Sequence, residues 1–497
     1  MKHFYIFCFI FFLCYSVADA QTNANVPGPE NVLVVYNSLD TTSFLVENYY
    51  KTARNIPASN IVPLTNLVNA DIFDSVSNTT HRIEITQEGE LISDSTVLSY
   101  DPINRHAWLY FIERIAEPIA RHLRTTIVNG EYLKDKIRFI VLCKGVPFRI
   151  ITTPNHAGSC NQNVTVDGLL CLLGDYINNP YSLMDLLNLE TPEPTPPHDC
   201  RGTFLIENPY FNADPNFTMT HNFKPNYYSI YNPHLGRNVT LSYLVTHLDA
   251  MSLQIAKDMI DRSKVAINSE GYTWFIDADP TPGQGGSIIL SQTTVENIFE
   301  TLGINNRKID GTEIVYTDFP SPLISYSSNG THTTVGSNHF FNEDYIQSQL
   351  TFNYTPGAII NTAESFNVTT LGTDPPVRRA EQGQITEFFK MGGTVGVGQA
   401  VHGSSGGIII QNDILLPSYA LGYTFVEAAY LGMNNLTDNR IVVGDPLTRI
   451  FNYTEQTLSG TNTLTSGDYK TKYVVPDGST LIIPSGADVT FSRNACL

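Results

Sequence analysis

Hydrophobic and polar positions alternate between two periods along most of this chain. Short runs of consecutive apolar residues, typical of strands buried on both faces of a sheet, are followed by longer stretches with apolar residues three and four apart, typical of amphipathic helices. The first such pair predicts a strand at 31–36 and a helix at 41–53. The repeated order predicts an α/β fold in which helices cover both faces of a mostly parallel sheet.

The same pattern predicts the further elements of this fold. We expect strands at 60–64, 137–143, 242–246, 272–276, 313–317, 358–361 and 393–400, and helices at 105–125, 250–265, 293–302, 384–391 and 421–431. Pro118 lies inside the helix predicted at 105–125 and should kink it. Residues 153–240 interrupt the pattern and are rich in Pro, Asn and Tyr, so we interpret them as an insert in the α/β domain.

The composition of the chain changes after Thr457. Residues 458–497 are poor in Leu and rich in Thr, Ser and Gly. Asp-Gly at 477–478 and Ser-Gly at 485–486 are typical of hairpin turns. They separate three short strand patterns, at 472–475, 480–483 and 488–491. We therefore expect a small antiparallel β appendage at 458–497, after an α/β domain at 21–457.

Residues 1–20 have the features of a secretory signal peptide. Lys2 precedes an apolar run at 4–14, and the small residues Ala18 and Ala20 precede the expected cleavage site. This run is too short to span a bilayer, and no later apolar run reaches the ~18–20 residues of a membrane helix. We expect a protein that is secreted, extracellular or in the lumen of the secretory pathway, with no transmembrane segment in the mature chain.

Export would place the cysteines and the Asn-X-Ser/Thr sequons in an oxidising, glycosylating compartment. The expected mature chain has five cysteines: Cys143, Cys160, Cys171, Cys200 and Cys496. The middle three lie in the insert, where a disulfide bond could hold a loop, whereas Cys143 ends an apolar strand and fits a buried thiol. Nine sequons occur, so the protein could be a glycoprotein if its host glycosylates exported chains.

The net charge of the chain argues against two classes of binding partner. Its net charge is −19 and its pI is about 5.0. Nucleic acid and anionic lipid both require a basic surface, so this balance argues against either as a partner. The ordinary explanation of the charge is an acidic, solvated surface.

Polar residues follow several of the predicted strands. Open parallel sheets bind ligands at the carboxyl ends of their strands, so these residues are the candidates for a site. They are Asn37, Ser38, Lys144, His247, Asp249, Asp277, Asp279, Glu364, Gln399 and His402. If the whole sheet is parallel, all of them lie along one edge.

Each candidate has a chemical and a structural interpretation. Asp277 and Asp279 could bind a divalent cation, although aspartates two apart more often form an Asx turn or an N-cap. Asp249 could act as an acid or base, or could cap the helix that follows it. His247 and His402 could each be a general base. His402 lies in a polar turn, where a histidine is more often simply exposed on the surface.

Lys144 and Arg149 flank a Gly-Val-Pro turn and could bind an anionic substrate or form structural ion pairs. The chain contains no Gly-X-Ser-X-Gly elbow, no His-Glu-X-X-His, no P-loop and no Gly-X-Gly-X-X-Gly between a strand and a helix. The sequence therefore names no reaction.

Several segments, in a fixed order, resemble an uncharacterised family of secreted, mainly bacterial proteins. They include 144–150, 166–170, 244–249, 275–279 and 443–447. More distantly, the late Gly-Asp-Pro turn at 444–446 and the sheet resemble the caspase-like fold of the gingipain cysteine proteases. Those proteases use a His-Gly pair and a later Cys at strand ends. Here only Cys496, in the tail, follows His402-Gly403, so the resemblance does not carry over a catalytic dyad.

Two functions follow from these observations. The first is a secreted, hydrolase-like protein with an acidic cleft at the strand ends. Asp249, Asp277 and Asp279 would provide its acid–base or cation-binding groups, with His247 or His402 as the base. The second is a non-catalytic extracellular binding or surface protein, built on a protease-like scaffold that has lost its nucleophile. Convergence of Asp249, Asp277 and His402 in one place would favour the enzyme.

Overall fold

The computed structural model describes most of the chain. The described residues are 26–87, 89–93, 105–150, 164–187, 206–218, 223, 228–232, 235–266, 272–277, 286–312, 316–328, 345–362, 367–368, 371, 385–400, 410–436, 440–450, 454–469 and 471–491. They divide into two compact units, Pro27–Asn452 and the residues from Tyr453 onward.

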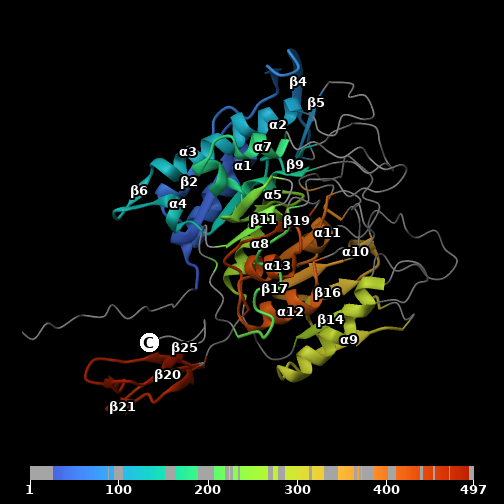
Figure 1. The fold of residues 1–497 in the computed structure, drawn as a ribbon. Coiled ribbons are helices and arrows are strands. Elements are labelled where there is room, and N and C mark those ends of the chain that lie inside the picture. The colour runs from blue at the N-terminus through green and yellow to red at the C-terminus, as the bar shows by residue number, and fades with distance from the viewer. Residues whose placement is uncertain are drawn as a thin grey trace, which may run out of the picture. The chain divides into compact units, whose positions relative to one another are not determined.

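A ten-stranded sheet forms the centre of the larger unit (Figure 1). Its strands, from one border to the other, are β15 (Arg307–Asp310), β14 (Thr273–Asp277), β16 (Leu323–Ser328), β17 (Tyr354–Asn361), β18 (Val395–Gln399), β19 (Arg440–Val443), β13 (Leu244–Leu248), β8 (Phe139–Cys143), β1 (Val32–Asn37) and β2 (Ile61–Leu64). Five of these strands (β8, β13, β16, β18 and β19) are buried at every residue, as expected for strands covered on both faces. The α/β class with a mostly parallel sheet is confirmed.

The sheet consists of two halves that run in opposite directions. Within each half all neighbouring strands are parallel, but β18 and β19, which join the halves, are antiparallel. Both halves have the same topology. From β1 the chain moves outward to β2 and then returns to β8 on the other side, and from β14 it moves outward to β15 and returns to β16. Each half therefore has its own topological switch point, between β1 and β8 and between β14 and β16.

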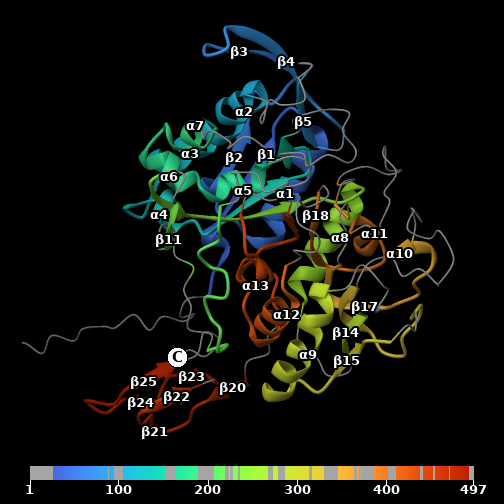
Figure 2. The same ribbon diagram turned by 45° about the vertical axis from the view of Figure 1, so that its right-hand side comes forward.

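Helices cover both faces of the sheet (Figure 2). Gly396 of β18 lies against Ile385 of α11 (Ile385–Lys390), whereas Asn361 of β17 contacts Asn412 of α12 (Asn412–Leu421). Asn361 is paired with Val397, and neighbouring residues of a strand point to opposite faces, so α11 and α12 lie on opposite faces. The other principal helices are α1 (Thr41–Arg54), α8 (Leu253–Lys264), α9 (Gly286–Thr301) and α13 (Phe425–Gly432).

Local capping explains where three of these helices begin. The Asp40 carboxylate accepts hydrogen bonds from two backbone N–H groups at the start of α1, and Ser252 does the same once for α8. Thr424 and Glu427 form a reciprocal capping box at the start of α13.

A smaller five-stranded sheet accompanies the first half. Its order is β10 (Val164–Thr165), β9 (Arg149–Ile150), β5 (Glu90–Ser93), β4 (Thr79–Ile85) and β3 (Ala70–Asp74). The insert supplies β10 and also α5 (Val166–Cys171), α6 (Leu173–Asn178), α7 (Ser182–Leu187) and the hairpin of β11 (Tyr228–Asn232) and β12 (Arg237–Leu241). Helix α5 packs on β13, so part of the insert belongs to the core of the domain.

Some predicted elements differ from the observed ones. The strand expected at 313–317 is absent from the described residues 316–317, and the chain instead forms β15 at 307–310. The sequence pattern also missed β16 and α12. The helix expected at 105–125 is broken at Ile112–Ala116 by a wider π turn, which separates α2 (Arg105–Phe111) from α3 (Glu117–Thr125). Pro118 is the second residue of α3 and follows this π turn, the kind of irregularity that accompanies a kink in a helix.

The C-terminal unit forms parallel pairs, so the expected antiparallel arrangement is wrong. Its six strands are β20 (Thr454–Thr457), β21 (Thr461–Thr463), β22 (Gly467–Tyr469), β23 (Thr471–Val474), β24 (Thr480–Ile482) and β25 (Val489–Phe491). The first three pair in order, and in parallel, with the last three. Two consecutive turns of chain thus lie one on the other, as in a β-solenoid. Gly478 and Gly486, where the pattern suggested hairpin turns, are at positive φ in turns of this unit, and Gly460 is at positive φ as well.

No helix among the described residues is long and apolar enough to cross a membrane. Both cysteines in the described part of the chain, Cys143 and Cys171, are buried free thiols, so Cys171 takes part in no disulfide here. Cys160, Cys200 and Cys496 lie outside the described residues.

Candidate functional site

The expectation that all candidate residues share one edge of the sheet is wrong. His247 lies near the end of β13 and Asp249 directly follows that strand, whereas Asp277 ends β14, and these two strands belong to halves that run in opposite directions. The carboxyl ends of β13 and β14 therefore lie at opposite edges. Asp249 and Asp277 cannot serve one common site at the strand ends.

At the carboxyl edge of the first half, the charged groups are paired with each other. The Lys144 ammonium lies 3.2 Å from Oδ1 of Asp249 and donates a 3.0 Å hydrogen bond to the carbonyl of Ala250. Both side chains are largely buried, with 14% and 7% of their surface exposed. Helix α8 is capped by Ser252, so the capping role considered for Asp249 is wrong. Asp249 instead neutralises Lys144, and the two link the loops after β8 and β13.

His247 forms a buried pair with a residue of the insert. Its Nδ1 lies 3.4 Å from Oδ2 of Asp167 on α5, and both residues are buried. Burial lowers the pKa of His247 to about 4 and raises the pKa of Asp167 well above its usual value. His247 is therefore neutral near pH 7, and burial favours the protonated form of Asp167. Phe148 packs edge-on against the imidazole, with ring centroids 6.1 Å apart. A neutral histidine enclosed in this way joins α5 to β13.

The described thiols are not activated for nucleophilic attack. Burial raises the pKa of Cys143 and of Cys171, the latter to about 12. The Cys171 sulfur lies 3.2 Å from the Tyr430 hydroxyl, which also donates to the carbonyl of Val245. A catalytic cysteine requires the opposite shift, toward the thiolate.

At the carboxyl edge of the second half, Asp277 lies at the topological switch point. It is fully buried and is paired in register with Asp310 of β15 on one side and Ser328 of β16 on the other. Asp310 has neighbours of its own, because it accepts hydrogen bonds from Thr312 and from the Tyr316 hydroxyl at 2.6 Å. An ion pair with Lys308 at 2.8 Å completes its surroundings. Although burial opposes ionisation of Asp310, these donors together hold its pKa well below the usual value.

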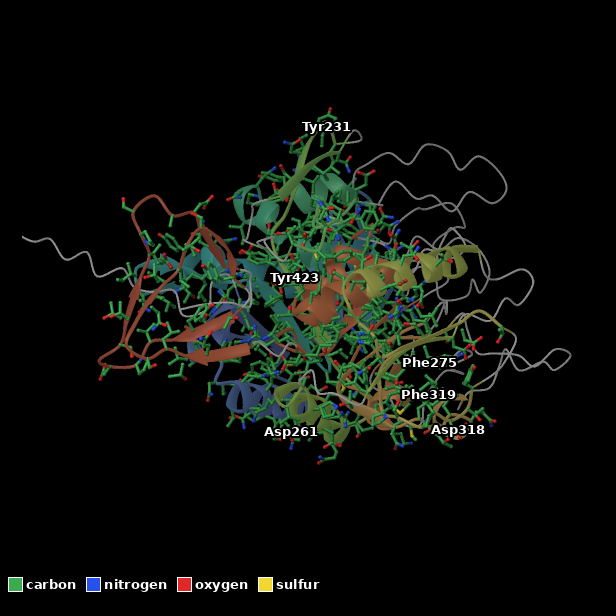
Figure 3. All side chains as sticks on the ribbon, turned by 90° about the horizontal axis from the view of Figure 1, so that it is seen from below. Tyr231, Asp261, Phe275, Asp318, Phe319 and Tyr423 are labelled. Carbon is green, nitrogen blue, oxygen red and sulfur yellow. The ribbon has the colours of Figure 1, made fainter. Side chains whose placement is uncertain are left out.

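An aromatic cluster lies beneath Asp277 on the same face of the sheet. Phe275, two residues earlier on β14, shares this face, and its ring lies beside that of Phe319, with centroids 5.2 Å apart (Figure 3). Tyr316, Tyr326 and Phe352 complete the cluster, with ring centroids 5.4, 6.2 and 5.8 Å from that of Phe275. Asp277 therefore shares a face of the sheet with closely packed aromatic rings, where its electrostatic interactions are less screened by solvent than in water.

A second polar cluster lies at the same edge, on the face covered by α12. Asn361, at the end of β17, donates hydrogen bonds of 2.7 Å to Oδ1 of Asn412 and 2.8 Å to the carbonyl of Ile410. The Ser327 hydroxyl lies 3.3 Å from the same Oδ1 atom. All three polar side chains are essentially inaccessible to solvent.

The small sheet reaches this edge. The Arg149 guanidinium of β9 forms a buried ion pair with Glu90 of β5 and donates a hydrogen bond to the carbonyl of Ala400, directly after β18. Both basic residues that flank the Gly-Val-Pro turn, Lys144 and Arg149, therefore form the structural ion pairs considered from the sequence.

Three candidate residues, Asp279, Glu364 and His402, lie outside the described residues. Within the described part of the chain, no group of three or more His, Cys, Asp or Glu side chains is arranged to hold a metal ion. The cation site predicted from Asp277 and Asp279 therefore stays a prediction.

Sequence reasoning missed Asp167, Asn361 and Asn412. Asp167 lies in the stretch interpreted as an insert, and only the packing of α5 on β13 brings it to His247. Asn361 ends a predicted strand, so the rule used for the other candidates could have found it. Asn412 begins a helix whose sequence, with an internal Pro417, gave no helical signal.

Comparison with protein-family models, with curated proteins and with solved structures finds no match to this chain.

Proposed function

We propose that the protein is an exported, hydrolase-like enzyme whose site lies at the carboxyl edge of β14, β16, β17 and β18. The observation that carries this proposal is the position of Asp277. It is a fully buried carboxylate at the end of β14, at the switch point of the second half, with Ser328 and Asp310 in register beside it. Open α/β sheets bind their ligands at such points.

The connectivity of the chain supports the choice of this edge. Asp279, Glu364 and His402 each follow, by two residues, the last described residue of the segments that contain β14, β17 and β18. Because they follow strands of this half along the chain, we include Asp279 and His402 in the proposed site. In this proposal Asp277 and Asp279 are the acid–base or cation-binding groups, and His402 is the base.

The two residues of the first half are left out of this site. Asp249 is paired with Lys144, and His247 is enclosed as a neutral partner of Asp167. The ion pair of Asp249 joins two loops, and the contact of His247 with Asp167 joins helix α5 to β13.

The test begins with the full chain purified from a secretory host, analysed for bound metal and screened with peptide and ester substrates. We expect turnover, loss of turnover in Asp277→Asn, and retention in Asp310→Asn. Asp310 is a matched control, because it is a buried carboxylate at the same level of the neighbouring strand. Turnover that survives Asp277→Asn would contradict the proposal.

A second candidate is a non-catalytic binding or surface protein on a protease-like scaffold. The state of the described thiols favours it, because burial raises the pKa of both Cys143 and Cys171, and a cysteine protease could use neither. The same screen separates the candidates. A protein that turns over no peptide or ester substrate, with or without added divalent cations, fits the binding protein.

A further inference from the structure

One buried donor near the proposed site has no partner. Among the described residues, Nδ2 of Asn412 has no hydrogen-bond partner, although the Asn412 side chain is completely buried. Leaving such a donor unpaired costs about 1–3 kcal/mol. Native proteins seldom leave this cost uncompensated, and the usual compensation is an ordered water, an ion or a ligand.

The orientation of the Asn412 amide is fixed by its neighbours. Asn361 donates 2.7 Å to Oδ1 of Asn412, and the Ser327 hydroxyl approaches the same oxygen at 3.3 Å. Asn361 is itself held by a hydrogen bond to the carbonyl of Ile410. A flipped amide would place two N–H groups against each other, so the NH₂ group is the one left unpaired.

The start of helix α12 adds a second, independent observation. The helix runs from Asn412 to Leu421, and its N-cap residue, Gln411, makes no side-chain capping bond. The first N–H groups of a helix point away from it with partial positive charge. The unpaired amide of Asn412 lies on this first turn. Both features favour an oxygen acceptor as the missing partner.

The charges nearby favour a neutral acceptor over an anion. Asp413 follows Asn412 in the first turn of α12. Asp277 ends a strand at the same edge, and the chain carries a net charge of −19. A carboxylate or phosphate would meet this negative field, whereas a carbonyl oxygen would not.

We propose that the Asn412 side-chain amide binds a carbonyl oxygen of an uncharged ligand at the carboxyl edge of β16 and β17. The inference rests on the proposed function and specifies its substrate class: a peptide or acyl group whose carbonyl is held by Nδ2 of Asn412. Asn361 is a positioning residue, because it acts only by holding Asn412.

The test uses the full chain labelled with ¹⁵N and N-methylacetamide as the probe. We expect the Asn412 side-chain amide resonance to shift on titration, and to be unaffected by inorganic phosphate. Asn412→Asp keeps an oxygen for Asn361 and removes the donor, so the probe should bind at least tenfold more weakly. Ser418→Ala is the matched control, because Ser418 is another buried polar residue of α12 whose hydroxyl has no partner in the structure. It should leave binding of the probe unchanged.

A resonance that does not move with the probe would overturn the inference and assign the position to a water molecule. If Asn412→Asp does not fold, the wild-type titration decides, with the resonance identified through Ser327→Ala. The outcome is separate from that of the proposed function. Probe binding without turnover of any substrate refutes the enzyme and keeps the carbonyl site, and turnover without a shift does the reverse.

Discussion

His247 and Asp277 lie near the carboxyl ends of two buried strands of one sheet, and these ends are at opposite edges. The cause is the antiparallel pairing of β18 with β19, for example Gly396 with Val443, at the junction of the two halves. A ligand above one edge cannot contact the other residue. Substitutions at the two positions should therefore have independent effects.

The buried pair of His247 and Asp167 predicts a loss of stability in mild acid. The folded-state pKa of His247, about 4, lies below its ordinary value of 6.5, because burial opposes the charged form. The unfolded chain thus takes up a proton first as the pH falls, and stability decreases between pH 6.5 and pH 4. The difference, 6.5 − 4 = 2.5, corresponds to about 3 kcal/mol. Urea unfolding at pH 7 and pH 4 measures it.

His247→Gln should remove most of this acid-dependent loss. Asp167 has the opposite sign, because its raised pKa makes its contribution decline as the pH rises. Asp167→Asn should therefore leave the acid-dependent loss in place and serves as the control. Equal pH profiles for the wild type and His247→Gln would show that His247 is not enclosed as described.

A buried network around Asp445 predicts one of the largest stability effects in the chain. Its fully buried carboxylate accepts a 2.7 Å hydrogen bond from Tyr50, a bond from Arg54 at 2.5 Å and a 2.9 Å bond from the backbone N–H of Leu447. Asp445→Ala leaves Arg54 without its partner and should reduce the free energy of unfolding by about 3–5 kcal/mol. Tyr50→Phe removes one bond and should lose about 1 kcal/mol. Urea denaturation compares the two, and similar losses would contradict this ranking.

The stacked turns of the C-terminal unit predict unequal effects at equivalent positions. Leu464 and Ile483 follow the paired residues Thr463 and Ile482, yet Leu464 is 5% exposed and Ile483 is 45% exposed. Leu464→Ala should lose about 2–5 kcal/mol, as for a core leucine, and Ile483→Ala less than about 1 kcal/mol. Hydrogen exchange of the β21 and β24 amides reports on this unit alone. Equal loss of protection in the two variants would contradict the solenoid arrangement.

The fold could be predicted from the sequence where burial fixes the pattern. The runs in β1, β8 and β14 are mostly apolar because both faces of these strands are covered, and α1 shows helical spacing because only one face is covered. Strand direction leaves no such trace, since a buried strand has the same pattern whether its neighbour is parallel or antiparallel. The reversal between β18 and β19, and the parallel pairs of the C-terminal unit, were therefore missed.

The candidate site was predicted less well for the same reason. The rule that follows strand ends found Asp277, but it grouped Asp277 with Asp249 because it assumed one direction for all strands. It could not find the partners of these residues. Lys144 meets Asp249, and Asp167 meets His247, through contacts between segments about 80 to 105 residues apart in the chain.

Two of the nine sequons predict opposite outcomes for glycosylation. Asn78 is exposed in the turn between β3 and β4, whereas Asn367 is buried. The Asn367 amide donates 2.9 Å to the Thr362 hydroxyl and its oxygen accepts from the N–H of Gln399, so a glycan has no room there. In the folded protein from a glycosylating secretory host, mass spectrometry should find a glycan at Asn78 and none at Asn367. A glycan at Asn367 would contradict the buried position of this residue.

The claim that the second half carries the site is tested most directly by comparing kcat/KM for Asp277→Asn and Asp249→Asn on the best substrate of the screen. Removing a carboxylate that transfers protons in the reaction typically lowers the rate ~10²–10⁴-fold, and we predict a loss in this range for Asp277→Asn. Asp249→Asn leaves the largely buried Lys144 without its partner and should lower the stability of the fold. Because Asp249 is outside the proposed site, kcat/KM of the folded protein should stay within about threefold of the wild type. The reverse order, with Asp249→Asn inactive and Asp277→Asn active, would move the site to the opposite edge and contradict the account.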